Sequence, residues 1–242
     1  LKDAIAAALA ARKAWTEMPM EHRVSIFLKA ADLIAAPMRD KVNAATMLGQ
    51  SKTAYQAEID TCELIDFLRF NVYYLQQIYD RQPNNTPNVW NRIEYRPLEG
   101  FVTAISPFNF TSIGANLPTA PAIAGNVVLW KPATTAVLSN YYVMQALMAA
   151  GLPAGVINFV PSRGSDMSKY VLSDPNLKDC TAVKNNHVYA IPGDIEALDS
   201  PVPASILASI WLAGILHPDQ VSTNTYTKEM NSFYETFYGI KK

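Results

Sequence analysis

The alternation of apolar runs and helical segments between residues 98 and 177 is the feature that most restricts the fold. Three short apolar runs, 100–106, 127–132 and 156–162, are each followed by a segment with helical composition, at 116–126, 135–151 and 165–175. Strands joined by helices pair in parallel, because a parallel connection needs a crossover of a dozen or more residues. Parallel sheets are covered on both faces, which matches strands that are apolar throughout. We therefore expect an α/β chain with a partial Rossmann-like, doubly wound parallel sheet.

The residues before this region have the apolar spacing of helices. The pattern predicts two helices from Asp3 to about Arg39, separated at Pro19, then a third over 41–48 and a long fourth over 51–80. The composition of 81–88 is that of a loop, and the alternation over 90–97 predicts an exposed strand or hairpin arm. We expect this helical part to be mostly scaffold.

Charge and cysteine content exclude several functions. The 242 residues carry a formal net charge of −1, which favours neither nucleic acid nor an anionic membrane as a partner. No segment reaches the ~18 consecutive apolar residues of a membrane span, and the first residues lack a signal-peptide layout. Two cysteines without metal-like spacing indicate a reducing compartment, so we expect a cytoplasmic protein, or a mitochondrial matrix protein if the source is eukaryotic. Since the chain begins at Leu1, we also expect that it was trimmed from something longer.

Polar residues follow the predicted strands at their carboxyl ends, where ligands bind in sheets of this kind. Asn109 comes just after the first strand and could donate its amide to an oxyanion, or simply form the turn after Pro107. Lys131 ends the second strand and could hold an anionic or hydroxyl-rich ligand, or be a solvated strand end. Neither G-x-G-x-x-G nor a P-loop pattern is present, and the single glycine of 162–166 is a weak phosphate signal.

Three long segments give the chain a family resemblance. They are TMLGQSKTAYQAEIDTCELIDFLRFN (46–71), LEGFVTAISPFNFTSIGANLPTAPAIAGNVVLWKPATTA (98–136) and AGLPAGVINFVPSRG (150–164). In this order they make residues 1–177 resemble the aldehyde dehydrogenase superfamily, and within it the branch that oxidises L-glutamate γ-semialdehyde to L-glutamate in proline catabolism. The resemblance implies NAD as cofactor and a dinucleotide site without the usual phosphate loop.

The resemblance also implies roles for individual residues. Asn109 would be the catalytic oxyanion donor that stabilises a tetrahedral thiohemiacetal. Lys131 would hydrogen-bond the adenosine ribose of NAD, with Ser106, through its backbone, and Pro107 lining the dinucleotide site.

Two further residues would contact the substrate. Phe110 would pack against the aliphatic part of the semialdehyde. Glu63, on the long helix, would lie near the amino group of the substrate, although a glutamate on such a helix is as easily explained as a solvated side chain.

The chemistry of the family also needs a nucleophilic cysteine and a carboxylate base. In the family these follow a Phe-Thr-Gly-Ser turn that is not found in this sequence. The neighbours of Cys180 do not match the family's cysteine segment, and Cys62 is interpreted as a small buried or half-buried helix residue. We therefore expect the chain to be catalytically inactive as written. His187 and His217 have no ligand spacing, so no metal site is predicted.

The last part of the chain has a different resemblance. Residues 181–242 resemble the C-terminal end of an iron-siderophore or cobalamin type substrate-binding protein of an ABC importer, with a strand over 187–191 and helices over about 203–216 and 226–238. The expected organisation is therefore 1–177 as an incomplete NAD-binding region and 178–242 as a strand-helix-helix tail, joined as in a chimera. No ligand role is carried over to the tail.

Three functions remain open on the sequence. The chain could be an aldehyde dehydrogenase segment with a small-molecule substrate, a periplasmic binding module of an importer, or an α/β scaffold with a vestigial site. A homo-oligomer is left open by all three. NAD binding would support the first, and binding of a ferric siderophore or corrinoid would support the second.

Overall fold

The computed structural model describes residues 1–164, 166, 184–185 and 203–240, and the chain divides into two compact units, Leu1–Arg163 and Gly164–Lys242. The predicted domain boundary at 177/178 and the predicted strand over 187–191 lie outside the described residues. So does the predicted helix over 165–175, apart from Asp166. The two units are treated separately below.

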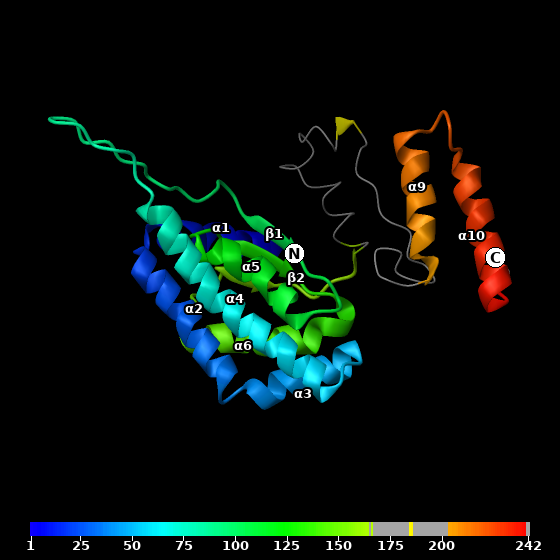
Figure 1. Ribbon diagram of the computed structural model, residues 1–242, viewed down its shortest axis with the longest axis horizontal. Coiled ribbons are helices and arrows are strands. Elements are labelled where there is room, and N and C mark those ends of the chain that lie inside the picture. Colours follow the sequence, from blue (N-terminus) through cyan, green and yellow to red (C-terminus); the bar gives the residue numbers. More distant parts are fainter. Residues whose placement is uncertain (165, 167–183, 186–202, 241–242) are drawn as a thin grey trace. The chain divides into compact units, whose positions relative to one another are not determined.

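The first unit begins with the helices that the apolar spacing predicted. They are α1 (Lys2–Glu17), α2 (Met20–Ala35), α3 (Arg39–Gln50) and α4 (Ala54–Asp80) (Figure 1). Pro19 precedes the first residue of α2, and Ser51 ends α3 with a left-handed φ of 53°. Thr53 and Gln56 form a reciprocal capping box that begins α4. These local signals explain why the helix boundaries were predictable.

A small parallel sheet follows the helices, in the order β1-β2-β3. Its strands are β1 (Val102–Ile105), β2 (Val128–Lys131) and β3 (Ile157–Phe159), and the register pairs Ile105 with Lys131 and Trp130 with Phe159. The parallel pairing confirms the predicted helix-rich α/β fold.

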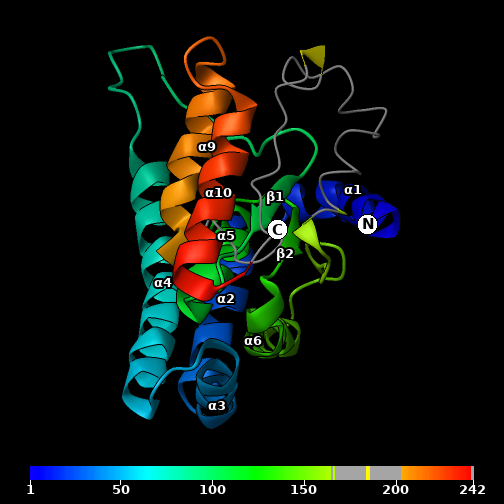
Figure 2. The same cartoon turned by 90° about the vertical axis from the view of Figure 1, so that its right-hand side faces the viewer.

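The crossover helices place the sheet inside the first unit. Helix α5 (Thr111–Ile123) connects β1 to β2, and the short 3₁₀ turn η1 (Thr134–Ala136) with α6 (Val137–Ala150) connects β2 to β3. Helix α5 packs against all three strands, while α1 packs against β2 and β3. Figure 2 shows α5 and α4 on one side of the strands and α1 on the other. Val128, Leu129 and Trp130 of β2 are all buried, as expected for a central strand.

The structure corrects the expectation that the first strand is covered on both faces. Of the four residues of β1, only Ala104 is buried, and Ile105 is 60% exposed. The reason is that β1 is an edge strand of the described sheet and pairs with β2 on one side only.

The segment over 90–97 is exposed as predicted, but it forms no strand. The only pairing in this region is an isolated bridge between Thr86 and Val89, and Figure 1 shows the segment projecting from the body of the unit. The Gln82 side chain holds the returning chain by donating to the carbonyl of Ile93 and accepting from its N–H. An isolated two-stranded arm has too few partners to be a stable ladder, which explains the difference.

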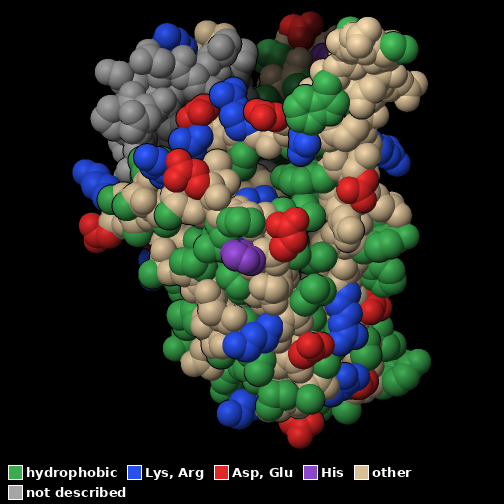
Figure 3. Space-filling model, turned by 90° about the vertical axis from the view of Figure 1, so that its left-hand side faces the viewer, with side chains coloured by type: hydrophobic (Ala, Val, Ile, Leu, Met, Phe, Trp, Pro, Cys, Tyr) green, Lys and Arg blue, Asp and Glu red, His purple; other side chains and the backbone are tan. Residues whose placement is uncertain are grey.

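Charged side chains on the face shown in Figure 3 are of both signs and are interspersed with apolar ones. This distribution agrees with the net charge of −1 and gives no single-sign field for a polyanion. Within the described residues, no helix is long and apolar enough to cross a membrane.

The described part of the second unit consists of the short 3₁₀ turn η2 (Pro203–Ser205), α9 (Ile206–Leu216) and α10 (Thr223–Tyr238). Both predicted tail helices are therefore confirmed as elements. Helices α9 and α10 pack around Ala204, Leu207 and Tyr234. Gly239 ends α10 with a left-handed φ of 66°.

Candidate functional site

A backbone hydrogen bond connects the carboxyl ends of β1 and β2. The backbone N–H of Ser106 donates to the carbonyl oxygen of Lys131 at 3.0 Å, one residue beyond the Ile105–Lys131 pair. Ser106, Pro107 and Lys131 therefore lie at the same edge of the sheet, with Asn109 and Phe110 following within the same turn.

The hydroxyl group of Ser106 is buried and is used inside the fold. It accepts a hydrogen bond from Nε1 of Trp130 at 2.6 Å and donates to the carbonyl oxygen of Gly114 at 2.7 Å. Gly114 needs this donor because the residue four positions later in α5 is Pro118, which has no N–H to complete the helical bond. Since the Ser106 backbone N–H is also engaged, the predicted contact of its backbone with a cofactor is left to its carbonyl group.

Asn109 is half-buried and its side chain is available to a ligand. Among the residues that the structure describes, none forms a hydrogen bond with its side-chain amide. The amide can therefore donate to an added oxygen atom without breaking a protein contact, as an oxyanion donor must. That role stays a prediction.

Phe110 is half-buried and directly precedes α5, where it cannot cap the helix because its side chain carries no oxygen atom. The ammonium group of Lys52 lies 4.1 Å from the centroid of the Phe110 ring, within the range of a cation–π interaction. The ring is therefore fixed on one side by a residue from the loop between α3 and α4.

The buried carboxylate of Asp60, on α4, supplies the cap that Phe110 cannot. Its Oδ2 accepts from the N–H of Thr111 at 2.9 Å, and its Oδ1 accepts from the N–H of Ser112 at 2.8 Å. Lys52 forms an ion pair with Oδ2 at 2.8 Å, so the 1% exposed carboxylate has a charged partner. A carboxylate at a helix N-terminus is favoured both by the free N–H groups and by the helix dipole. This cap begins α5 at Thr111, earlier than the segment 116–126 that the sequence marked as helical.

The Thr111 hydroxyl is the centre of a buried polar network behind this cap. It donates to Oγ of Ser139 at 2.9 Å, so it must accept the hydrogen bonds from Thr46 at 2.8 Å and from Gln50 at 2.8 Å. Ser139 then donates to the carbonyl oxygen of Ala136. The network ties α3, α5 and α6 together directly behind the residues that follow β1.

Lys131 presents a free cation at the other strand end. Its side chain is half-buried and forms no ion pair or hydrogen bond with any of the described residues. An unpaired ammonium group at the carboxyl end of a parallel strand suits a hydroxyl-rich or anionic ligand. After β3, Ser162 lies at the same kind of position with a buried hydroxyl that has no partner among the described residues.

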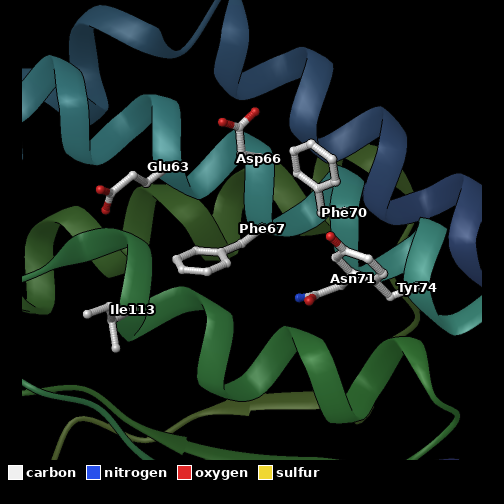
Figure 4. A pocket seen from close by; sticks show the side chains of 7 residues that line it. All are labelled: Glu63, Asp66, Phe67, Phe70, Asn71, Tyr74 and Ile113. Carbon is white, nitrogen blue, oxygen red and sulfur yellow. The ribbon is translucent and has the colours of Figure 1, made fainter.

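A pocket of about 470 Å³ lies between α4 and α5. It is lined by Glu63, Asp66, Phe67, Phe70, Asn71 and Tyr74 of α4 and by Ile113 of α5 (Figure 4). The Phe67 ring lies between the two helices, whereas the carboxylates of Glu63 and Asp66 point in different directions. The two carboxylates therefore do not form a pair for general acid–base work.

Glu63 connects this pocket to the first turn of α5. The hydroxyl of Ser112 donates to Oε2 of Glu63 at 3.3 Å, although the glutamate remains exposed overall. The structure thus brings Glu63 close to the helix that follows Asn109 and Phe110. Its contact with the amino group of a substrate stays a prediction.

The interpretation of Cys62 as a buried helix residue is wrong. Cys62 is exposed, and Nη2 of Arg39 lies 3.1 Å from its Sγ. The same arginine donates from Nε to Glu58 at 2.9 Å, and the hydrogen bonds from Arg39 and Asn43 lower the pKa of Glu58. Cys62 lies one helical turn from this ion pair, on the solvent side of α4. Cys180 lies outside the described residues.

The far end of α5 is also held by side chains. Nε1 of Trp15 donates to the carbonyl of Ala122 at 3.0 Å, and Nε of Arg23 donates to that of Ile123 at 3.4 Å. Burial lowers the pKa of Arg23, and its Nη1 donates to the carbonyls of Thr16 and Met18. Helix α5 is therefore fixed at both ends by residues that are distant in sequence.

Sequence reasoning missed Lys52, Asp60 and the role of the Ser106 hydroxyl. A signal for Asp60 exists, because it lies on the same helical stripe as the buried Ala57, Leu64 and Leu68. A carboxylate on an apolar stripe requires a buried partner. No cluster of three or more metal-ligating side chains occurs among the described residues.

The parallel sheet, with helices on both sides, defines an α/β protein of the doubly wound class. The chain belongs to the aldehyde dehydrogenase family, which matches residues 1–188. It is 57% identical over 178 residues to the mitochondrial Δ1-pyrroline-5-carboxylate dehydrogenase of Emericella nidulans, an alignment that covers 73% of this chain and 31% of that protein. It is 53% identical over 178 residues to the human mitochondrial enzyme of the same name, covering 73% and 32%.

A solved structure gives the same result. The Δ1-pyrroline-5-carboxylate dehydrogenase of Mycobacterium tuberculosis, crystallised with NAD, is 58% identical with a TM-score of 0.69, covering 71% of this chain and 32% of that one. The chain thus spans about a third of the length of the relatives it matches. The resemblance of residues 181–242 to an importer binding protein receives no support from these comparisons and stays a prediction.

Proposed function

We propose that this chain supplies the cofactor-binding region of an NAD-dependent dehydrogenase that oxidises L-glutamate γ-semialdehyde to L-glutamate. The observation that carries the proposal is the 57% identity over 178 residues to a Δ1-pyrroline-5-carboxylate dehydrogenase, within a chain whose family match, residues 1–188, contains all the proposed site residues. The edge formed by Ser106 and Lys131, with the Asn109 amide beside it that has no hydrogen bond to the described residues, supports the proposal. Since the names of both curated relatives include the word mitochondrial, a matrix location in a eukaryotic source is part of the proposal.

The described residues fit a dinucleotide at the carboxyl edge of the sheet. Lys131 offers an unpaired ammonium group to a ribose hydroxyl, and Ser106 and Pro107 form the adjacent wall through their backbone. When bound, NAD accepts the hydride that leaves the substrate carbon atom. The protein's part is to hold this acceptor at the strand ends.

Asn109 and Phe110 are the proposed substrate-side residues of the strand end. The Asn109 amide would donate to the oxygen atom that becomes negatively charged when a nucleophile adds to the aldehyde. The Phe110 ring would pack against the aliphatic carbon atoms of the substrate, and Glu63 would accept hydrogen bonds from its ammonium group. The nucleophilic cysteine and the base of this reaction are assigned to no residue of this chain.

Titration of the chain with NAD by calorimetry tests the proposal. We expect binding that weakens by about 10–100-fold in Lys131→Met, the equivalent of the ~1.5–3 kcal/mol of one hydrogen bond from a charged group. Lys41→Met, which removes an exposed lysine of α3, is the matched control and should bind NAD as the parent chain does. The absence of heat at millimolar NAD, or equal losses in both variants, would reject the proposal.

A second measurement tests the assignment of the chemistry. We expect no NADH from the chain alone when it is mixed with NAD and the semialdehyde, because neither a nucleophile nor a base is assigned to it. NADH formation above background would contradict this, and its loss in Cys62→Ser or Cys180→Ser would then identify the nucleophile.

A further inference from the structure

The short segment between Ser106 and Thr111 is fixed at both ends by buried side-chain contacts. At its start, the Ser106 hydroxyl is bonded to Trp130 and Gly114. At its end, the N–H groups of Thr111 and Ser112 are bonded to Asp60. Asn109, which lies between these ends, forms no side-chain hydrogen bond with any of the described residues, so its position depends on the contacts at the two ends.

Asp60 is too costly to be explained as an ordinary helix cap. The carboxylate is 1% exposed, and a buried charge is expensive unless it is paired and fully hydrogen-bonded. A serine or threonine at position 110 would cap α5 without burying any charge. What the carboxylate adds is a connection from α4 to the first two residues of α5 at 2.8–2.9 Å, made across 51 and 52 residues of sequence.

Lys52 connects Asp60 to Phe110, the residue that precedes α5. Its ammonium group is 2.8 Å from Oδ2 of Asp60 and 4.1 Å from the centroid of the Phe110 ring, and its side chain is 14% exposed. One cation therefore neutralises the cap and also holds the aromatic residue next to Asn109. The two contacts fix the helix start and the ring in one arrangement.

We propose that the Lys52–Asp60 ion pair is the positioning element of the Asn109–Phe110 segment, acting on the site through Thr111, Ser112 and the Phe110 ring. This inference rests on the proposed function, because it concerns the residues that would face the substrate. Preorganised donors are effective because they need no rearrangement when charge develops, and a displacement of about 1 Å can cost ~100-fold in rate. Lys52 and Asp60 touch no reacting atom and are positioning residues.

The test measures the order of the segment in the intact chain. In the parent protein, ¹⁵N relaxation should give backbone order parameters near ~0.85 at Asn109 and Phe110, and in Asp60→Asn these should fall below ~0.6. Asparagine has the shape of aspartate but carries an NH₂ group that cannot accept the second N–H or pair with Lys52. Lys52→Met removes the cation and should displace the ring signals of Phe110 and the side-chain NH₂ signals of Asn109.

The matched controls are Glu58→Gln and Arg39→Met, which break the Arg39–Glu58 ion pair between α3 and α4. They should leave the signals of Asn109 and Phe110 unchanged, so an effect seen only in Asp60→Asn and Lys52→Met is specific to the segment. If the signals of Thr111 and Ser112 move in Asp60→Asn while Asn109 keeps its order and its NH₂ signals, Asp60 is a cap only and the proposal fails. If Asp60→Asn does not fold, the Lys52→Met and Arg39→Met comparison decides the question alone.

Calorimetry with NAD separates this inference from the proposed function. If Asp60→Asn loses order at Asn109 and the parent chain binds NAD, both the positioning and the proposed function are supported. If Asp60→Asn loses order at Asn109 and the parent chain does not bind NAD, the positioning of the segment is supported and the proposed function is rejected. If Asn109 keeps its order in both Asp60→Asn and Lys52→Met, the positioning is rejected, whether or not the chain binds NAD.

Discussion

The hydrogen bond from Ser106 to Gly114 predicts an energetic coupling between Ser106 and Pro118. Ser106→Ala leaves two buried groups without partners, the carbonyl of Gly114 and the indole N–H of Trp130. Each unpaired buried group costs about 1–3 kcal/mol, so we expect a loss of ~2–6 kcal/mol in the free energy of unfolding. This is large beside the ~5–15 kcal/mol that holds a typical domain together.

Pro118→Ala should restore part of this loss. An alanine at position 118 has the N–H that the helix otherwise lacks, and this N–H points at the Gly114 carbonyl. In the Pro118→Ala background, Ser106→Ala then leaves only the Trp130 N–H unpaired. Its cost should fall by about 1–3 kcal/mol, and this difference is the coupling energy of the double-mutant cycle.

Urea unfolding followed by tryptophan fluorescence measures the cycle. All variants carry Trp211→Phe, because Trp211 lies in the second unit while Trp15, Trp90 and Trp130 lie in the first. Pro121→Ala is the matched control, since it restores an N–H that faces the carbonyl of Leu117 instead of Gly114. Equal costs of Ser106→Ala in the parent and Pro118→Ala backgrounds, or equal coupling with Pro121→Ala, would refute the reasoning.

Three further predictions follow from contacts described above or from the glycine geometry. Gly155→Ala should destabilise the first unit in urea by more than Gly100→Ala, because both glycines have positive φ (85° and 78°) but only at Gly155 would the new Cβ meet backbone, 2.6 Å from the carbonyl oxygen of Ala7. Trp15→Phe should cost ~0.5–1.5 kcal/mol by removing one of the two hydrogen bonds that the Ala122 carbonyl accepts, the other coming from the N–H of Gly125, whereas Trp90→Phe, on the exposed arm, should cost nothing measurable in the same titration. The pKa of Glu58 is lowered, so this carboxylate stabilises the fold at pH values above its ordinary pKa of 4.5 and loses that contribution as the pH falls through the lowered pKa. Glu58→Gln should therefore flatten the acid side of a plot of unfolding free energy against pH. The change should be less than ~1 kcal/mol, because the Arg39–Glu58 pair is exposed.

The fold of the first unit was predictable because its signals are local. Pro19 and Gly151 mark helix boundaries by their backbone conformation, Thr53 marks one by its side-chain cap, and the apolar runs mark the strands. The strand-helix alternation then restricts the topology to a parallel sheet. What failed was the burial of β1 and the pairing of the arm over 90–97, because both depend on how many neighbours surround a strand, which the strand's own sequence does not contain.

The candidate site was predictable only in part. Asn109, Lys131 and Ser106 follow from the rule that ligands bind at the carboxyl ends of parallel strands, and the family resemblance gave them roles. Asp60 and Lys52 were missed because they act from α4 and from the loop before it, across more than fifty residues of sequence. Pro118 is visible in the sequence, and so is the carbonyl that it leaves without a helical partner. The sequence does not show that the Ser106 hydroxyl lies opposite this carbonyl and donates to it.

The dependence of α5 on distant residues has a consequence for the order of folding. The helix contains Pro118 and Pro121 and has no cap of its own, so in isolation it would have little tendency to form. Its two ends are closed by Asp60 on α4 and by Trp15 and Arg23 near the chain's beginning, contacts that span 51 to 107 residues. Because the entropy of closing such loops is lost before the contacts stabilise anything, α5 should join late, after the first four helices have assembled. The strand-end segment bearing Asn109 would then acquire its shape in the last steps of folding, and a newly made chain would complete its scaffold before its site.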